Sequence, residues 1–161
     1  MNVLRSTLIG TAAGAAATTA LNVTTYADMA LRGRPSSDMP ATLVKNVAAS
    51  AGVEALAADE ERAANRRLGV GALLGLANGV GLGAVYGAVR PWLRPWVPLP
   101  LAGLAIGAAA MALSDVPAAR TGATDPSTWG TQGWLADIIP HAIYGIALAG
   151  TFEALDPDAT I

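Results

Sequence analysis

Three long stretches of this sequence contain no charged residue, and they limit its possible folds more than any other feature. They are residues 6–27, 68–89 and 95–114, of 22, 22 and 20 residues. A helix that crosses a ~30 Å hydrocarbon layer needs about 20 residues at 1.5 Å each, so each stretch is long enough. In a fourth stretch, 134–152, only Asp137 and His141 interrupt the uncharged residues. We therefore expect an all-α integral membrane protein, a single membrane domain over 1–161, with transmembrane helices at about 5–28, 66–90, 98–114 and 133–154.

The composition excludes several other classes of protein. Charged residues make up 14% of the chain, whereas a soluble domain has about 25%. High hydrophobicity excludes a disordered chain. The absence of cysteine excludes a disulfide scaffold and a thiolate metal site, and we expect no metal and no cofactor. A net charge of −2 argues against nucleic acid as a partner. A soluble bundle of buried Ala-rich helices is the alternative, and three long uncharged runs disfavour it.

Other residues mark the ends of the predicted spans. Asp115 and Pro117 are expected to stop the helix of the third span, because the residue before a proline leaves the α region. The first loop, 28–67, is expected to hold a short amphipathic helix at about 38–52, which either lies on the membrane or docks a partner, or covers one end of the bundle. Tryptophan prefers the level of the lipid headgroups, and the four tryptophans precede the third and fourth spans as interface anchors: Trp92, Trp96, Trp129 and Trp134.

Positive charges predict the orientation. Seven Lys and Arg residues lie in the first and third loops, against three on the other side. Because positive residues favour the cytoplasmic side, we expect both of these loops in the cytoplasm and both termini outside.

Glycines recur every four residues in the second span, at Gly71, Gly75, Gly79, Gly83 and Gly87. This spacing places them on one helix face, where a neighbouring backbone can approach closely. The other spans repeat the pattern more briefly, with Gly10 and Gly14, Gly103 and Gly107, and Gly145. A nucleotide-binding loop at 79–84 is excluded because no strand precedes it and no acidic residue follows at the required distance. We expect the spans to pack through these small-xxx-small faces.

Polar residues inside the spans are the candidates for chemistry, and they are few: Asn22, Asn78, Asp137 and His141. Asp137 and His141 are four residues apart and therefore share a helix face. Pro140 between them deprives the carbonyl of Ala136 of its helical donor. Such a group could bind a cation or relay a proton. The alternative is structural: an aspartate at the interface, a packing histidine, and asparagines that hydrogen-bond between helices.

Two segments resemble a known group of proteins. The opening LRSTLIGTAAGAAATTALNVTTYADMALRGRPSSDMPA and the segment TDPSTWGTQGWLADIIPHAIYGIAL resemble small uncharacterised four-span membrane proteins of high-GC actinobacteria. More distantly, the Gly-rich layout is similar to YagU-like inner-membrane proteins. The resemblance implies four spans in a bacterial cytoplasmic membrane, adds weight to Asp137 and His141, and implies no activity.

Three functions fit these patterns. The first is a non-catalytic structural or accessory subunit that associates with itself or with other integral membrane proteins through its glycine faces. The second is a small homo-oligomeric channel or proton-linked transporter that uses Asp137 and His141. The third is a lipid or hydrophobe binder with a lateral pocket beside the fourth span. An enzyme is not expected, because no nucleophile, base and orienting residue occur together.

Overall fold

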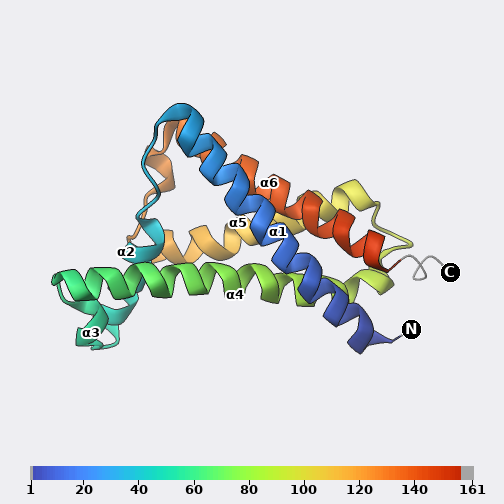
Figure 1. The fold of residues 1–161 in the computed structure, drawn as a ribbon, viewed down its shortest axis with the longest axis horizontal. Helices are drawn as coiled ribbons and strands as arrows, with labels where there is room; N and C mark the ends of the chain where they lie inside the picture. Colours follow the sequence, from blue (N-terminus) through green and yellow to red (C-terminus); the bar gives the residue numbers. More distant parts are fainter. Residues whose placement is uncertain (1, 157–161) are drawn as a thin grey trace.

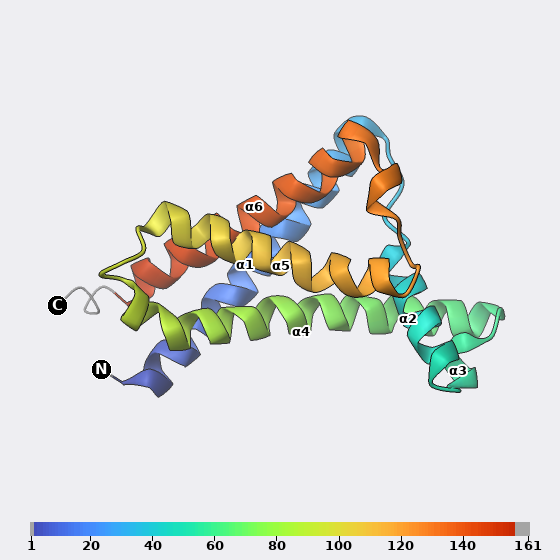
Figure 2. The same cartoon turned by 180° about the vertical axis from the view of Figure 1, so that it is seen from behind.

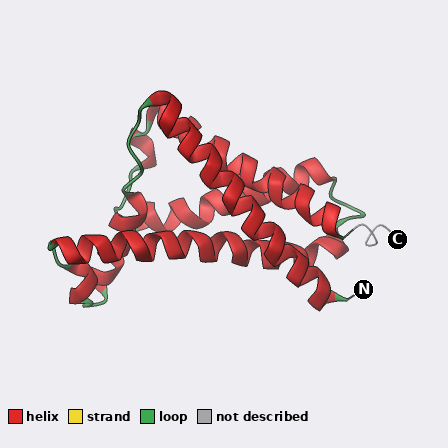
Figure 3. Ribbon diagram, viewed as in Figure 1, coloured by secondary structure: helices red, strands yellow, loops and turns green. Residues whose placement is uncertain are grey.

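The computed structural model describes residues 2–156, and within that range it contains helices and loops but no strand (Figure 3). The elements are α1 (Val3–Arg32), α2 (Met39–Ser50), α3 (Glu54–Ala57), α4 (Glu61–Leu93), α5 (Leu99–Arg120), the 3₁₀ helix η1 (Pro126–Thr128) and α6 (Gly130–Leu155). The all-helical prediction is confirmed. The predicted single domain also includes residues 1 and 157–161, which lie outside the described range.

Three helices of the described range are long and apolar enough to cross a membrane: α4, α5 and α6. They are consistent with a multi-pass membrane protein. Helix α1 has 30 residues but is not among the three, because threonines and Asn22 interrupt its alanines and lower its hydropathy. Its length, about 45 Å at 1.5 Å per residue, is sufficient for a span. A fourth span at α1 therefore stays a prediction.

Local chemistry explains both ends of α1. The side chain of Asn2 accepts a hydrogen bond from the backbone N–H of Arg5 at the start of α1, and Gly33 ends that helix in the left-handed region with φ +62°. The prediction that Asp115 and Pro117 stop the third long helix is wrong, since α5 continues to Arg120. Proline removes one helical donor, yet the carbonyl of Pro117 still accepts from the N–H of Thr121 at 3.0 Å.

The long helices converge at one end of the molecule and diverge at the other. Helix α4 runs along the length of the molecule, α1 crosses α4 obliquely, and α6 lies beside α1 and approaches α4 near the C-terminal end of both helices (Figure 1). The view from behind shows α5 above α4 and crossing α6 (Figure 2). The hydrophobic core occupies the convergent end, and its members are Ala13, Ala17, Tyr86, Ala102, Tyr144, Leu148, Ala149 and Phe152. At the divergent end, α2 and the connections α1–α2 and α5–α6 bridge the separated helices.

Candidate functional site

Glycines bring the backbones of α1 and α4 into direct contact. A Cβ atom added to Gly83 would lie 2.6 Å from the Cα of Gly14, and one added to Gly87 would lie 2.8 Å from the Cα of Gly10. Real Cβ atoms do not approach other carbons so closely, so these positions require glycine. Gly79, one turn earlier on α4, lies against the side chain of Thr18.

A second glycine contact joins α5 to α6. A Cβ at Gly107 would lie 2.6 Å from the carbonyl oxygen of His141, and one at Gly145 would lie 2.9 Å from the Cα of Gly107. Gly103 is slightly less crowded, since its Cβ would lie 3.3 Å from the carbonyl oxygen of Gly145.

The remaining glycines of the α4 series have different surroundings. Gly71 lies against Pro40 of α2, and a Cβ at Gly75 would meet no atom within 4 Å. The series on α4 therefore divides into two parts. Its C-terminal part contacts α1, and its N-terminal part faces the space that opens where α1 and α4 diverge.

Ion pairs connect the helices at the convergent end. Arg90 of α4 has a 4% exposed side chain, and its Nε donates to the Glu153 carboxylate of α6 at 2.8 Å. Arg94 also pairs with Glu153, and Arg5 of α1 pairs with Asp156. The sequence shows these residues only as charges that bound the uncharged runs. Their pairing fixes α1, α4 and α6 to one another at this end.

A cavity of about 750 Å³ fills the space at the divergent end. Three helices each line it with residues at i, i+3, i+4 and i+7 spacing, which is a single helix face. On α1 these residues begin at Thr18 and end at Met29, on α4 they run from Leu68 to Leu82, and on α6 from Gly133 to Tyr144. The wall is mostly apolar, and the residues that supply it include Leu21, Leu68, Leu76, Leu82, Ala110 and Leu113.

All four polar residues predicted inside the spans line this one cavity: Asn22, Asn78, Asp137 and His141. Nδ1 of His141 lies 2.8 Å from the carbonyl oxygen of Asp137 and 3.3 Å from its Oδ1. At the narrow end, the hydroxyl of Tyr144 donates to the carbonyl oxygen of Gly79 at 2.6 Å, which connects α6 to α4. The structure thus brings together residues that the sequence distributes over three helices.

Asp115 is a further acidic residue next to this site, and its position shortly before Pro117 in the sequence predicts only the end of a helix. Its carboxyl group lies near that of Asp137, and its Oδ1 accepts a hydrogen bond from the Ser114 hydroxyl at 3.1 Å. The order of the helices along the sequence could have indicated that Asp115 and Asp137 are near each other. Helices α5 and α6 form an antiparallel hairpin, and residues at similar distances before and after its connecting loop lie at the same level.

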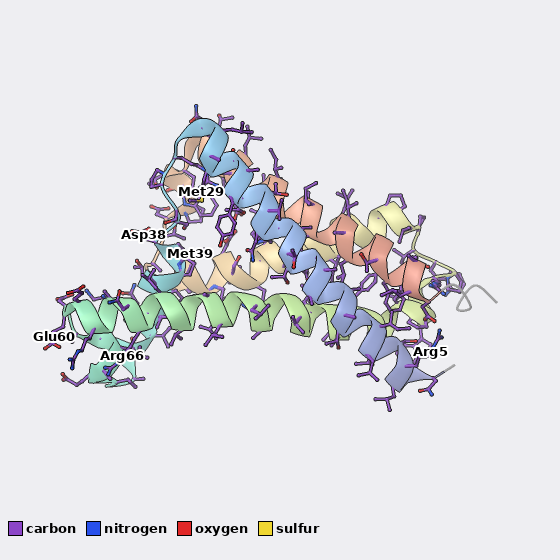
Figure 4. The ribbon with its side chains drawn as sticks, viewed as in Figure 1. Arg5, Met29, Asp38, Met39, Glu60 and Arg66 are labelled. Atoms are coloured by element: carbon purple, nitrogen blue, oxygen red, sulfur yellow. The ribbon has the colours of Figure 1, made fainter. Side chains whose placement is uncertain are left out.

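Polar residues surround the wider end of the cavity. Arg34 contributes to the lining but forms an ion pair with Asp28, whereas Asp38 has no partner among the ion pairs of the described residues. Figure 4 shows Met29, Asp38 and Met39 grouped where α1 connects to α2, with Arg5 at the opposite end of the molecule.

The predicted interface anchors divide between the two ends of the molecule. Trp92 and Trp96 are 54% and 82% exposed near the convergent end. Trp129 and Trp134 pack together at the divergent end, with ring centroids 5.0 Å apart. Trp129 also lines the cavity, and its Nε1 donates to Thr124 Oγ1 at 2.8 Å.

Within residues 2–156, no three His, Cys, Asp or Glu side chains are grouped so that they could hold a metal ion. Comparison of the chain with models of protein families, with curated proteins and with solved structures gave no match. The resemblance to small actinobacterial membrane proteins therefore stays a prediction, and the cavity itself is the strongest indication of function.

Proposed function

We propose that this chain is a four-span integral membrane protein that binds a small amphiphilic molecule in the cavity between α1, α4 and α6. One observation carries the proposal: a single cavity combines three apolar helix faces with the polar residues Asn22, Asn78, Asp137 and His141. Ligand sites are typically cavities of about 300–1,000 Å³ with mostly apolar walls and a few polar groups, and 750 Å³ lies within that range.

The packing of α1 supports its role as the fourth span. Between Ser6 and Thr18 it lies against α4, and it also packs extensively on α6. If α4 and α6 cross the bilayer, a helix of this length in contact with both has to share the bilayer with them. The intrachain contacts also cover one of the threonines of α1 that lower its hydropathy, Thr18, which is 8% exposed.

The same contacts reduce the support for an accessory subunit that acts through glycine faces. Gly79, Gly83 and Gly87 are covered by α1, so they offer no surface to a second protein.

A channel is also less well supported. The lining residues extend only to Leu82 and Tyr144, where the hydrophobic core begins, and this favours a blind pocket over a path through the molecule. A binding role without catalysis fits the cavity best.

A pair of tryptophan variants tests the proposal. Gly75→Trp places a large side chain in the cavity, whereas Gly81→Trp places the same side chain in open space outside the cavity lining. The full chain is reconstituted in lipid nanodiscs and photolabelled with dodecanol that carries a diazirine in its chain. Labelled residues are then mapped by mass spectrometry.

We expect cavity residues such as Leu21 and Leu113 to be labelled in the wild type and in Gly81→Trp, and to lose at least about nine-tenths of that label in Gly75→Trp. Labelling of Leu101 and Leu104, exposed on α5, serves as the internal reference for contact with lipid. Equal labelling of the cavity in both variants would contradict the proposal.

A further inference from the structure

We propose that the molecule bound in this cavity is an organic cation, a hydrophobic amine or quaternary ammonium ion whose head lies beside Asp137. The inference rests on the proposed function and names the chemical class of the ligand. It follows from the charges that face the cavity and from the apolar surface that surrounds them.

The charged residues around the cavity give an acidic balance. Asp137 and the exposed Asp38 line it, and Asp115, which is not a lining residue, lies near Asp137. Against them, Arg34 and His141 are the basic residues among the described lining residues. Arg34 is already paired with Asp28, a carboxylate outside the lining. Among the described lining residues there are therefore two carboxylates, Asp38 at the wider end and Asp137 deeper in the cavity, and one basic residue, His141, that is not paired with a carboxylate outside the lining.

The Asp137 carboxylate is also incompletely satisfied. Its Oδ1 faces His141 at 3.3 Å, which is longer than an ordinary charge-assisted hydrogen bond. Its Oδ2 is buried and has no hydrogen-bond donor among the described residues. A carboxylate in apolar surroundings is costly unless a positive charge or donors accompany it, and a bound cationic head beside Asp137 would supply that charge.

The rest of the lining favours an organic cation over an inorganic one or a protein segment. The described residues contain no metal-binding group, so a bare divalent ion would lack ligands. A second transmembrane helix, with ~20 residues and a length of about 30 Å, is too large for a cavity of about 750 Å³. Apolar faces on α1, α4 and α6 instead suit a hydrocarbon chain or ring that extends from the charged head toward Tyr144.

Three diazirine probes with the same twelve-carbon chain test the inference, with trimethylammonium, hydroxyl and sulfate heads. Wild type and Asp137→Asn are labelled in nanodiscs, and the cavity label is divided by the label on Leu101 and Leu104 so that partitioning into lipid cancels. We expect the ammonium probe to label the wild-type cavity at least about tenfold more than the hydroxyl probe, which corresponds to ~1.4 kcal/mol. Asp137→Asn should bring that ratio close to one.

The hydroxyl probe separates the possible outcomes. If it labels the cavity of Asp137→Asn as strongly as the wild type, the variant is folded and loss of the ammonium preference is due to the missing charge. Equal labelling of the wild type by the ammonium and hydroxyl probes, or preference for the sulfate, overturns the inference while the proposed function stands. Absence of cavity labelling by all three probes overturns both.

Discussion

At the scale of single residues, the charges of this chain have two different roles that the sequence does not distinguish. Arg90, Arg94 and Glu153 form a compact ion-pair group at the convergent end, with Arg90 almost fully buried. Lys45 and Asp59 form a pair on the surface, where the Asp59 side chain is 88% exposed. A buried charge that loses its partner is strongly destabilising, whereas an exposed pair contributes little.

We expect Glu153→Gln to lower the free energy of unfolding by about 3–5 kcal/mol, because it leaves two buried guanidinium groups without a counter-charge. The measurement is unfolding of the purified protein in mixed micelles with increasing sodium dodecyl sulfate. Lys45→Gln is the matched control, and its unfolding curve should superimpose on that of the wild type. A Glu153→Gln curve equally close to the wild type would show that the convergent end does not depend on these ion pairs.

The surface pair predicts a titration. The Lys45 ammonium, hydrogen-bonded to the Asp59 carboxylate, lowers the pKa of that carboxyl group below its usual 3.8. The small stabilisation from the pair is therefore present above that usual value and is lost as the pH falls through the lowered pKa. Carbon-13 NMR of the Asp59 carboxyl group should report the lowered pKa, and Lys45→Gln should return it toward 3.8. An unchanged pKa in Lys45→Gln would contradict the pair.

At the scale of the helices, glycines that look alike in the sequence have unlike surroundings. Gly81 and Gly83 are two residues apart on α4, yet a Cβ at Gly81 meets open space and one at Gly83 meets the backbone of α1. Glycine inside a helix costs about 0.5–1 kcal/mol relative to alanine, so it persists without penalty only where the close approach compensates for that cost.

We expect Gly83→Ala to destabilise the protein by about 1–3 kcal/mol, because the added methyl group forces α1 and α4 apart. Gly81→Ala should be neutral or slightly stabilising, since it relieves the helix cost without any clash. Both variants are compared in the same dodecyl sulfate unfolding experiment. The α1–α4 contact described above would be contradicted if Gly83→Ala unfolded no more readily than Gly81→Ala.

The sequence predicts where these helices lie along the chain well, and which helices pack against one another less well. Uncharged runs locate α1, α4 and α5, and the interrupted stretch 134–152 locates α6, because solvation penalises charge in long apolar helices and that penalty is local to each helix. The extent of α5 was missed at Pro117, where the helix stays intact beyond a residue that disfavours it: the N–H of Thr121 donates to the Pro117 carbonyl, and Asn46 of α2 donates to the carbonyl of Thr121. Asp115 was missed for a related reason: its nearness to Asp137 depends on how two helices meet, and no property of either helix alone specifies that.

At the scale of the whole molecule, the cavity follows from an asymmetry between the two ends. Glycine contacts and ion pairs hold α1, α4 and α6 together at one end, and the same straight helices must then separate at the other. The sequence shows Asn22, Asn78, Asp137 and His141 as polar residues on separate helices. Their convergence could not be predicted from the sequence because it depends on the crossing of α1 over α4, which backbone contact at Gly10 and Gly14 determines.

The arrangement of the ends makes the topology testable. The N- and C-terminal ends of the described chain lie together, beside the α4–α5 connection and away from α2 (Figure 1). If all four long helices cross the bilayer, residue 2 and residue 96 lie on one side, and residues 37 and 127 on the other. Because the chain has no cysteine, single-cysteine variants can report the side of each position without background.

We expect Asn2→Cys and Trp96→Cys to react with a membrane-impermeant maleimide in intact cells, and Ser37→Cys and Ser127→Cys to react only after permeabilisation. The direction follows from the excess of Lys and Arg in the first and third loops. A complete reversal of the four results would invert the orientation but retain four spans. Reaction of Asn2→Cys on the same side as Ser37→Cys would mean that α1 does not cross. The cavity would then lie between α4, α6 and a helix at the membrane surface, and its ligand would reach it from water rather than from lipid.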